Sequence, residues 1–112
     1  MMGRHKSAIE IYDEALKINS EDWECYHWKA NCYYNIDDRQ RAKQCLKQAL
    51  TYNKDESSYF LFGKIFTEQQ DYFNAIDIYK RALDISQENC DLLTTLGLLY
   101  MKVCKTLALG IL

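Results

Sequence analysis

The chain contains no proline and only four glycines among its 112 residues. Sandwiches and barrels of short strands need many turn residues, so this scarcity argues against an all-β fold. Proline is also the residue that interrupts helices most effectively, and its absence leaves long helices possible. With 48% hydrophobic and 27% charged residues, the composition is that of a globular protein. These features together predict a single all-α domain.

An excess of one charge is also missing. Fourteen Lys and Arg against sixteen Asp and Glu give a net charge of −2. Proteins that bind nucleic acids present a strongly basic face, so we predict no nucleic-acid partner. One helix does carry a basic run, formed by Arg39, Arg41, Lys43 and Lys47. We interpret it as a solvated face, with an acidic partner or anionic lipid headgroups as the alternative.

The five cysteines do not form a disulfide framework or a metal site. Their number is odd and no C-x-x-C pair occurs, whereas small secreted domains carry an even set. Cys25, His27 and Cys32 share one predicted helix, but residues two apart on a helix point to different sides. No further ligand completes a tetrahedral site. The N-terminus lacks the apolar core of a signal peptide. We therefore predict a cytoplasmic protein without metal or cofactor.

Motifs of enzymes are absent as well. The sequence has no G-x-G-x-x-G, P-loop, H-E-x-x-H or G-x-S-x-G motif. Its carboxylates lie along helix faces or in turns, where no cleft lets a pair act as acid and base. The most apolar stretch, residues 92–112, contains Lys102 and Lys105, each costing about 2.5–3.5 kcal/mol in a bilayer. We predict no catalytic residues, and membrane contact only through partner proteins.

Two repeated motifs organise the chain. The first has a small residue, a large one four positions later and a small one three further on: Ala8-x3-Tyr12-x2-Ala15, Ala42-x3-Leu46-x2-Ala49 and Ala75-x3-Tyr79-x2-Ala82. The second alternates with it: Tyr26-x2-Lys29-Ala30-x2-Tyr33, Tyr59-x2-Phe62-Gly63-x2-Phe66 and Leu93-x2-Leu96-Gly97-x2-Tyr100. Small residues let antiparallel helices approach closely, and large ones fill the space between them. The motifs and their period of about 34 residues resemble the tetratricopeptide repeat (TPR) family.

This resemblance implies an all-α TPR helix-turn-helix solenoid, wound as a right-handed superhelix of about six helices. Each repeat has a helix A with the second motif and a helix B with the first. The register predicts helices near 5–18, 22–35, 39–52, 56–69 and 72–85, and one that begins near 89. Their predicted capping residues are Ser20, Asp22, Asp38, Asp55, Asp71, Ser86 and Asn89.

The register also divides the single array of residues 1–112. We expect a half repeat at 3–21, whole repeats at 22–55 and 56–88, a half repeat at 89–103 and a divergent tail at 104–112. An array that begins and ends within a repeat leaves apolar surface open. We therefore expect a chain of marginal stability that is a fragment of a longer repeat protein.

The aromatic residues fall into two sets. The repeat predicts core positions for Tyr12, Tyr33, Phe66, Tyr79 and Tyr100. Trp23, Trp28 and Tyr34 are not required by the repeat. Aromatic side chains of that kind favour a protein interface, although a purely structural role is an equal alternative.

By resemblance to TPR proteins, helices A line a concave binding groove. The predicted groove residues are Glu24, His27, Asn31, Tyr34, Asn35, Phe60, Lys64, Thr67, Asp91, Thr94 and Leu98. This mixed polar and apolar set suits an extended peptide or a partner helix. TPR co-chaperones grip the carboxylate of a chaperone C-terminus with a clamp of Lys, Asn and Arg. Only Asn31 matches that clamp, and Asp91 would repel the anion, so the co-chaperone function is disfavoured.

Five runs of sequence resemble a TPR-containing subunit of the BBSome, from the Bardet–Biedl syndrome protein group: residues 5–12, 22–24, 63–65, 75–82 and 88–100. The resemblance implies a non-enzymatic adaptor in ciliary membrane-protein trafficking and cilium assembly. Implied partners are other BBSome subunits, centriolar satellite components and dynein–dynactin. The implied sites are the cilium, basal body and centriolar satellites. The alternatives are a regulatory TPR segment of a larger enzyme, such as a glycosyltransferase, or a truncated fragment without function.

Overall fold

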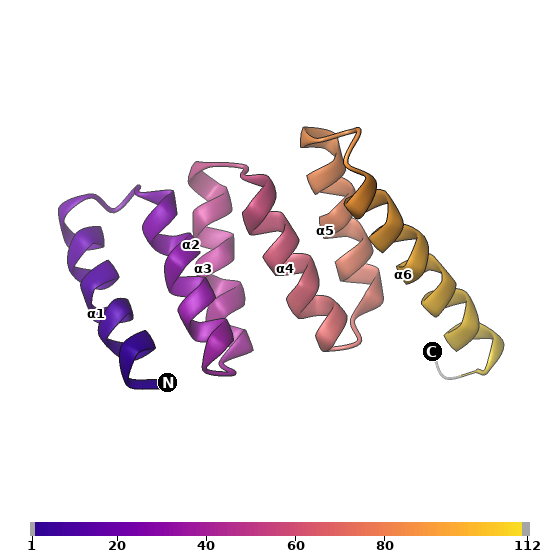
Figure 1. The fold of residues 1–112 in the computed structure, drawn as a ribbon, viewed down its shortest axis with the longest axis horizontal. Coiled ribbons are helices and arrows are strands. Elements are labelled where there is room, and N and C mark those ends of the chain that lie inside the picture. Colours follow the sequence, from indigo (N-terminus) through magenta and orange to yellow (C-terminus); the bar gives the residue numbers. More distant parts are fainter. Residues whose placement is uncertain (1, 111–112) are drawn as a thin grey trace. The chain divides into compact units, whose positions relative to one another are not determined.

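The structure, a computed structural model, describes residues 2–110. Six α-helices and no strand occur in this range (Figure 1). The helices are α1 (Met2–Ile18), α2 (Trp23–Asn35), α3 (Arg39–Tyr52), α4 (Glu56–Glu68), α5 (Tyr72–Ile85) and α6 (Cys90–Ala108). The predicted all-α class and the number of helices are confirmed. The main difference lies in α6, which continues beyond residue 103 into the segment expected to be a divergent tail, whose residues 111–112 lie outside the described range.

The chain divides into two compact units, one ending at Ser58 and the other beginning at Tyr59. In the first unit, α2 packs against both α1 and α3. In the second unit, α5 packs against α6. The ring of Tyr79 on α5 also lies against Gly63 of α4, most of which belongs to this unit. Each unit therefore has a core of its own.

The repeated motifs form these cores. In α3 the small and large residues of the first motif are fully buried: Ala42, Leu46 and Ala49. In α5 the same positions are also buried: Ala75, Tyr79 and Ala82. Alanine at these sites lets the helices approach closely, while the large residue between the alanines fills the gap. Period and residue size together explain why the helices pair in this register.

Short polar side chains begin most of the helices, as predicted. The side chains of Asp22, Asp38, Asp71 and Asn89 each accept a hydrogen bond from a backbone N–H in the following first turn. Asp55 does the same for α4 by accepting from the Ser58 N–H at 3.2 Å. These caps satisfy backbone donors that the helix itself leaves without partners.

Two predicted caps have other roles. The backbone carbonyl of Ser20 accepts a hydrogen bond from the Tyr26 hydroxyl at 3.1 Å, and the cap of α2 is Asp22 instead. Ser86 ends α5 rather than beginning α6, and its N–H donates to the Ala82 carbonyl. The prediction was wrong for Ser20, whereas Ser86 is a capping residue as predicted, at the end of α5. Residue type marks a helix boundary but not which helix the residue caps.

Helices α2 and α4 end in the same tight turn. Asp37 and Gln70 adopt left-handed backbone angles, with φ of 66° and 61°. The N–H of the next residue reaches back into the helix, from Asp38 to the Tyr33 carbonyl and from Asp71 to the Phe66 carbonyl, both at 2.9 Å. This pattern is a Schellman turn, and here it leads directly into the capping Asp of the next helix.

Helix α6 lacks this turn. It runs for 19 residues, whereas α2 and α4 have 13 each. Its left-handed residue is Gly110, with φ of 72°. The helix A at 89–103 therefore continues as helix through positions where the other two copies turn.

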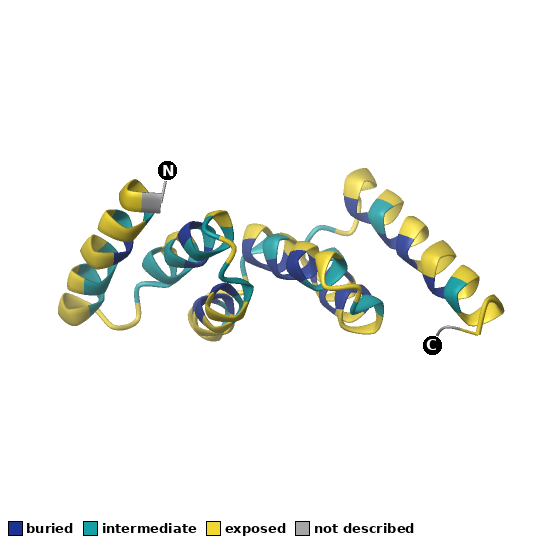
Figure 2. Cartoon of the chain, turned by 90° about the horizontal axis from the view of Figure 1, so that it is seen from below, coloured by how far each residue is buried: buried dark blue, intermediate teal, exposed yellow. Residues whose placement is uncertain are grey.

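One core prediction was wrong. Tyr100 on α6 is 44% exposed, although Tyr79 is buried and Tyr12, Tyr33 and Phe66 are half-buried. Exposed positions recur at each turn along α6 (Figure 2). The physical reason is that no helix B of the described residues lies over this side of α6, so the motif has nothing to pack against.

Candidate functional site

The predicted groove residues of the first unit form one line along α2: Glu24, His27, Asn31, Tyr34 and Asn35. Residues three and four apart on a helix lie on the same face, so this spacing brings the side chains together. Glu24 and Asn35 are exposed, while the other three are half-buried. We call this set the α2 stripe.

His27 is the most constrained member of the α2 stripe. Its Nδ1 shares a hydrogen bond of 2.8 Å with the hydroxyl of Ser58, which is fully buried. Trp28 meets the imidazole edge-on with ring centroids 5.1 Å apart, and Trp23 does so at 6.4 Å. The two tryptophans that the repeat does not require therefore pack around this histidine.

Burial also sets the charge of His27. Desolvation lowers the pKa of its imidazole below the ordinary value, and the carboxylates of Asp55 and Glu24 oppose the shift only in part. The ring is therefore neutral at neutral pH, with one nitrogen bonded to Ser58. A neutral imidazole among tryptophan rings offers a partner an aromatic surface rather than a charge.

The remaining residues of the α2 stripe make contacts within the chain. The side-chain amide of Asn35 donates to the Asn31 carbonyl at 2.8 Å. The Arg39 guanidinium lies over the ring of Tyr34, 5.8 Å from its centroid. That cation–π contact holds the ring at the end of the stripe and places a positive charge beside it.

Three of the predicted groove residues lie on α4, in the second unit. Phe60 is partly exposed and meets the ring of Tyr79 edge-on, with centroids 5.6 Å apart. Lys64 is exposed one turn further along. The hydroxyl of Thr67 donates to the Gly63 carbonyl at 2.8 Å, so it is turned toward its own helix. These side chains give an aromatic edge beside a basic residue.

Asp91, Thr94 and Leu98 lie on one face of α6, and all three are exposed. Leu98 and the neighbouring Met101 add apolar surface next to the acidic first turn. An extended peptide or a helix with apolar and polar side chains would find partners for both on this face.

Sequence analysis missed an ion pair between α1 and α2. The ammonium of Lys29 lies 2.6 Å from the Asp13 carboxylate, and the Lys29 side chain is only 15% exposed. Burial alone would lower the pKa of Lys29, but the hydrogen bond to Asp13 reverses the shift and raises it. The signal was present, since Phe62 and Leu96 occupy the same repeat position and a lysine there requires a partner.

Metal-binding groups and free thiols are two kinds of chemistry that the described residues could carry. Among residues 2–110 no group of His, Cys, Asp and Glu is placed to hold a metal ion. Burial raises the pKa values of the Cys25, Cys32 and Cys45 thiols, which leaves them protonated and weakly nucleophilic. Within the same range, none of the helices has the length and apolar character to span a bilayer.

Comparison with protein families gives two matches. A family described as "Anaphase-promoting complex, cyclosome, subunit 3" matches residues 1–82, and a family described as "TPR repeat" matches residues 63–103. The two matches overlap and together cover residues 1–103. The chain belongs to the tetratricopeptide repeat family.

Curated relatives of this TPR chain include a "BBSome complex member BBS4" from Bos taurus, 45% identical over 103 residues. The same-named protein of Mus musculus is 45% identical over 102 residues. These alignments cover 92% and 91% of this chain but 20% of each relative. The chain thus spans about a fifth of the length of these relatives.

Solved structures support the fold. One described as "First TPR of Spaghetti (RPAP3) bound to HSP90 peptide SRMEEVD" has a TM-score of 0.81, covering 91% of this chain and 82% of that one. Because the sequence identity is only 17%, this structural similarity is evidence for the TPR arrangement alone. The similarity therefore confirms the predicted all-α TPR solenoid and says nothing about the ligand.

Proposed function

We propose that this TPR chain is a non-enzymatic scaffold of the BBSome kind, acting in ciliary membrane-protein trafficking and cilium assembly. The observation that carries the proposal is the 45% identity to BBS4 proteins across nearly the whole chain. The absence of a metal-binding group among residues 2–110 and the protonated thiols are compatible with a binding role. Proposed partners are BBSome subunits, centriolar satellite components and dynein–dynactin, met in the cytoplasm, cilium and basal body.

We further propose that helices A provide the binding surface. The α2 stripe offers a neutral imidazole and aromatic rings, and α4 offers Phe60 beside Lys64. On α6, Leu98 lies between acidic and hydroxyl side chains. An extended segment with alternating apolar and polar residues matches this chemistry, because it can present apolar side chains to the aromatic and leucine side chains and polar ones to the charged and hydroxyl groups. The proposed division into two half repeats, two whole repeats and a tail assigns one helix A to each of these surfaces.

Affinity purification tests this function. The tagged chain is expressed in ciliated cells, and the co-purified proteins are identified by mass spectrometry. We expect BBSome subunits to co-purify with it. The variant Leu98→Asp places a charge on the exposed groove face of α6 and should reduce their recovery severalfold. Phe73→Asp, an exposed apolar position on α5 outside the predicted groove, is the matched control and should not.

The three possible results of the purification lead to different conclusions. Recovery of BBSome subunits with the natural chain and the control, and their loss with Leu98→Asp, supports both the function and the surface. Equal recovery with all three chains rejects the α6 surface and keeps the scaffold function. Recovery of chaperones without any BBSome subunit rejects the scaffold function for this chain.

A further inference from the structure

Two neighbouring side chains on the first turns of α2 combine an aromatic ring with a negative charge. Glu24 and Trp28 are four residues apart, so they lie next to each other on one face of the helix. Glu24 is exposed, and Trp28 is 47% exposed although tryptophan is usually among the more buried residues. We call these two residues the α2 pair. Asn31 of the α2 stripe lies one turn further on the same face, so the pair borders the proposed binding surface.

Contacts that reach the core hold the Trp28 ring in place. The ring packs edge-on with the His27 imidazole, and the two ring planes make an angle of 84°. His27 in turn shares its 2.8 Å hydrogen bond with the hydroxyl of Ser58, which is fully buried. A ring that is already positioned loses little conformational freedom when a partner binds. Trp28 is therefore suited to anchor a ligand.

The Glu24 carboxylate is not neutralised within the described part of the chain. Residues 2–110 provide it with no hydrogen bond and no ion pair. The other charged group that acts on the neighbouring His27 is the carboxylate of Asp55, which is also negative. The α2 pair therefore lies in a negative local environment.

Two lysines of the first unit are paired with other carboxylates. The Lys29 ammonium lies 2.6 Å from the Asp13 carboxylate, and the Lys17 ammonium lies 3.0 Å from the Glu14 carboxylate. Lys29 is on α2 itself, but its side chain is directed to α1 by this contact. Neither cation is bound to the α2 pair.

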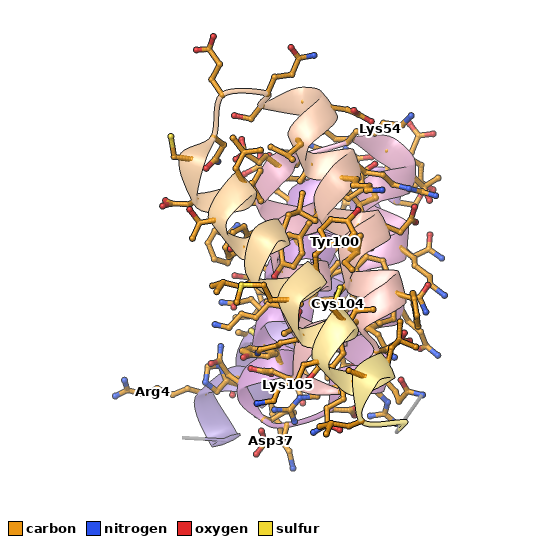
Figure 3. The ribbon with its side chains drawn as sticks, turned by 90° about the vertical axis from the view of Figure 1, so that its right-hand side faces the viewer. Arg4, Asp37, Lys54, Tyr100, Cys104 and Lys105 are labelled. Carbon is orange, nitrogen blue, oxygen red and sulfur yellow. The ribbon has the colours of Figure 1, made fainter. Side chains whose placement is uncertain are left out.

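Figure 3 shows where two further cations of the first unit lie. Arg4 is at the lower end of the view, as is Asp37, which follows the end of α2, whereas Glu24 belongs to the first turn of that helix. Lys54 is at the upper end and comes after α3. It forms no ion pair with Glu24 in the described range. A cation bound to Glu24 is therefore left for a partner to supply.

The chemistry of the α2 pair favours a guanidinium group as the ligand. A cation is attracted to the face of a tryptophan ring, and a carboxylate beside the ring attracts the same cation. A planar guanidinium can stack on an indole while its N–H groups donate to both oxygens of a carboxylate. A lysine ammonium is more strongly hydrated and has no plane to stack. An acidic side chain would be repelled by the Glu24 carboxylate.

We propose that the α2 pair binds an arginine side chain of the partner segment. The guanidinium lies on the open part of the Trp28 ring and donates hydrogen bonds to the Glu24 carboxylate. This inference rests on the proposed function, because it names the partner chemistry for part of the surface that helices A provide. The arginine fixes which residue of an extended segment lies over the start of α2.

Peptides of one design test this proposal. The probe is an acetylated and amidated Ser-Leu-Ser-X-Ser-Leu-Ser peptide, in which X is arginine, lysine or the uncharged arginine analogue citrulline. Each peptide is titrated into the full chain, and the indole N–H resonance of Trp28 is followed by NMR. We expect a Kd on the order of 1 mM for the arginine peptide. The citrulline peptide should bind about three- to thirtyfold more weakly, because it lacks the charge that both members of the pair attract.

Matched variants assign the preference to the α2 pair. Glu24→Gln and Trp28→Leu should each weaken the arginine peptide about two- to fivefold and leave the citrulline peptide nearly unchanged. Glu10→Gln, which removes the same charge from an exposed position on α1, is the control and should bind like the natural chain. Circular dichroism checks that each variant keeps its helices. Raising the salt concentration from about 50 to 500 mM should weaken the arginine peptide alone.

The outcomes of the titrations also separate this proposal from the proposed function. A preference for arginine that Glu24→Gln and Trp28→Leu remove, and Glu10→Gln keeps, supports the arginine site. Equal binding of the three peptides overturns it but leaves a peptide-binding surface in place. A preference that persists in both variants, or no binding of the arginine peptide up to about 5 mM, overturns it as well. The scaffold function is judged independently, by the recovery of BBSome subunits in the purification.

Discussion

Gly63 and Gly97 occupy the same position of the repeat, but Gly63 is covered by a neighbouring side chain and Gly97 is open. A Cβ on Gly63 would lie 2.7–2.9 Å from three ring atoms of Tyr79, whereas a Cβ on Gly97 would meet nothing within 4 Å. The neighbouring motif positions differ in the same sense, since Tyr59 is 6% exposed and Leu93 is 51% exposed. The residues of the helix A motif are therefore buried only where a helix B packs against them.

The same comparison explains the lengths of the two helices. Helix α4 ends where Gln70 adopts a left-handed conformation and Asp71 caps the next helix. Helix α6 has Cys104 and Lys105 at these positions and continues instead. Neither residue favours a positive φ or caps a helix well. Where the left-handed residue and the capping Asp are replaced, the helix continues. The motif residues that would form a core in α4 then stay exposed on α6.

Removing the Tyr79 ring that packs on Gly63 should have the largest effect on stability. Tyr79→Ala deletes a buried ring that contacts both Gly63 and Phe60, so we expect a loss of about 3–5 kcal/mol in the free energy of unfolding. Tyr100→Ala, on the exposed face of α6, should cost less than about 1 kcal/mol. Urea unfolding followed by circular dichroism at 222 nm measures both. Losses of similar size would contradict the distinction between covered and open motifs.

The matched glycine substitutions should have opposite signs. Gly63→Ala forces a methyl group against the Tyr79 ring, so we expect a net destabilisation of about 1–2 kcal/mol. Gly97→Ala adds helix propensity in open space and should stabilise by up to about 1 kcal/mol. Urea unfolding of the two variants under identical dilute conditions compares them. A stabilising Gly63→Ala would mean that the tyrosine ring moves aside freely.

Much of the fold could be predicted from the sequence because its determinants are periodic. Small residues at a period of about 34 residues locate the pairs of helices, and Asp22, Asp38 and Asp71 locate three of the starts. The position of Tyr100 could not be predicted in this way. A repeat pattern states which face should be buried, but burial depends on whether another helix is there.

The candidate site was predictable to a similar extent. Helical spacing placed the α2 stripe on one face, because that needs only the register. The hydrogen bond between His27 and Ser58 and the ion pair between Lys29 and Asp13 join residues of different helices. Such pairs depend on side-chain geometry rather than on period. The charged residue at an apolar repeat position was the one sequence signal that pointed to either of them.

The reactivity of the cysteine thiols compares an open helix face with a covered one without any substitution. Cys104 lies exposed on α6, whereas Cys45 is buried and burial raises the pKa of its thiol. In dilute solution we expect Cys104 to react with a thiol reagent at least about tenfold faster than Cys45, equivalent to about 1.4 kcal/mol. Mass spectrometry of the modified peptides at successive times measures both rates.

The smallest expected effect is on the pH dependence of stability. It concerns His27 on α2 and Thr94 on α6, which occupy the same position of the repeat. His27 on α2 is half-buried and bonded to Ser58, while Thr94 on α6 is exposed and cannot titrate. Burial lowers the pKa of His27 in the folded chain, so the unfolded chain binds a proton more readily. Stability should therefore fall as the pH drops through the unfolded histidine pKa of about 6.5. Urea unfolding between about pH 5 and 8 should show a shallower decline in His27→Gln and the natural decline in Thr94→Val. An unchanged pH slope in His27→Gln would show that His27 takes up its proton as easily folded as unfolded.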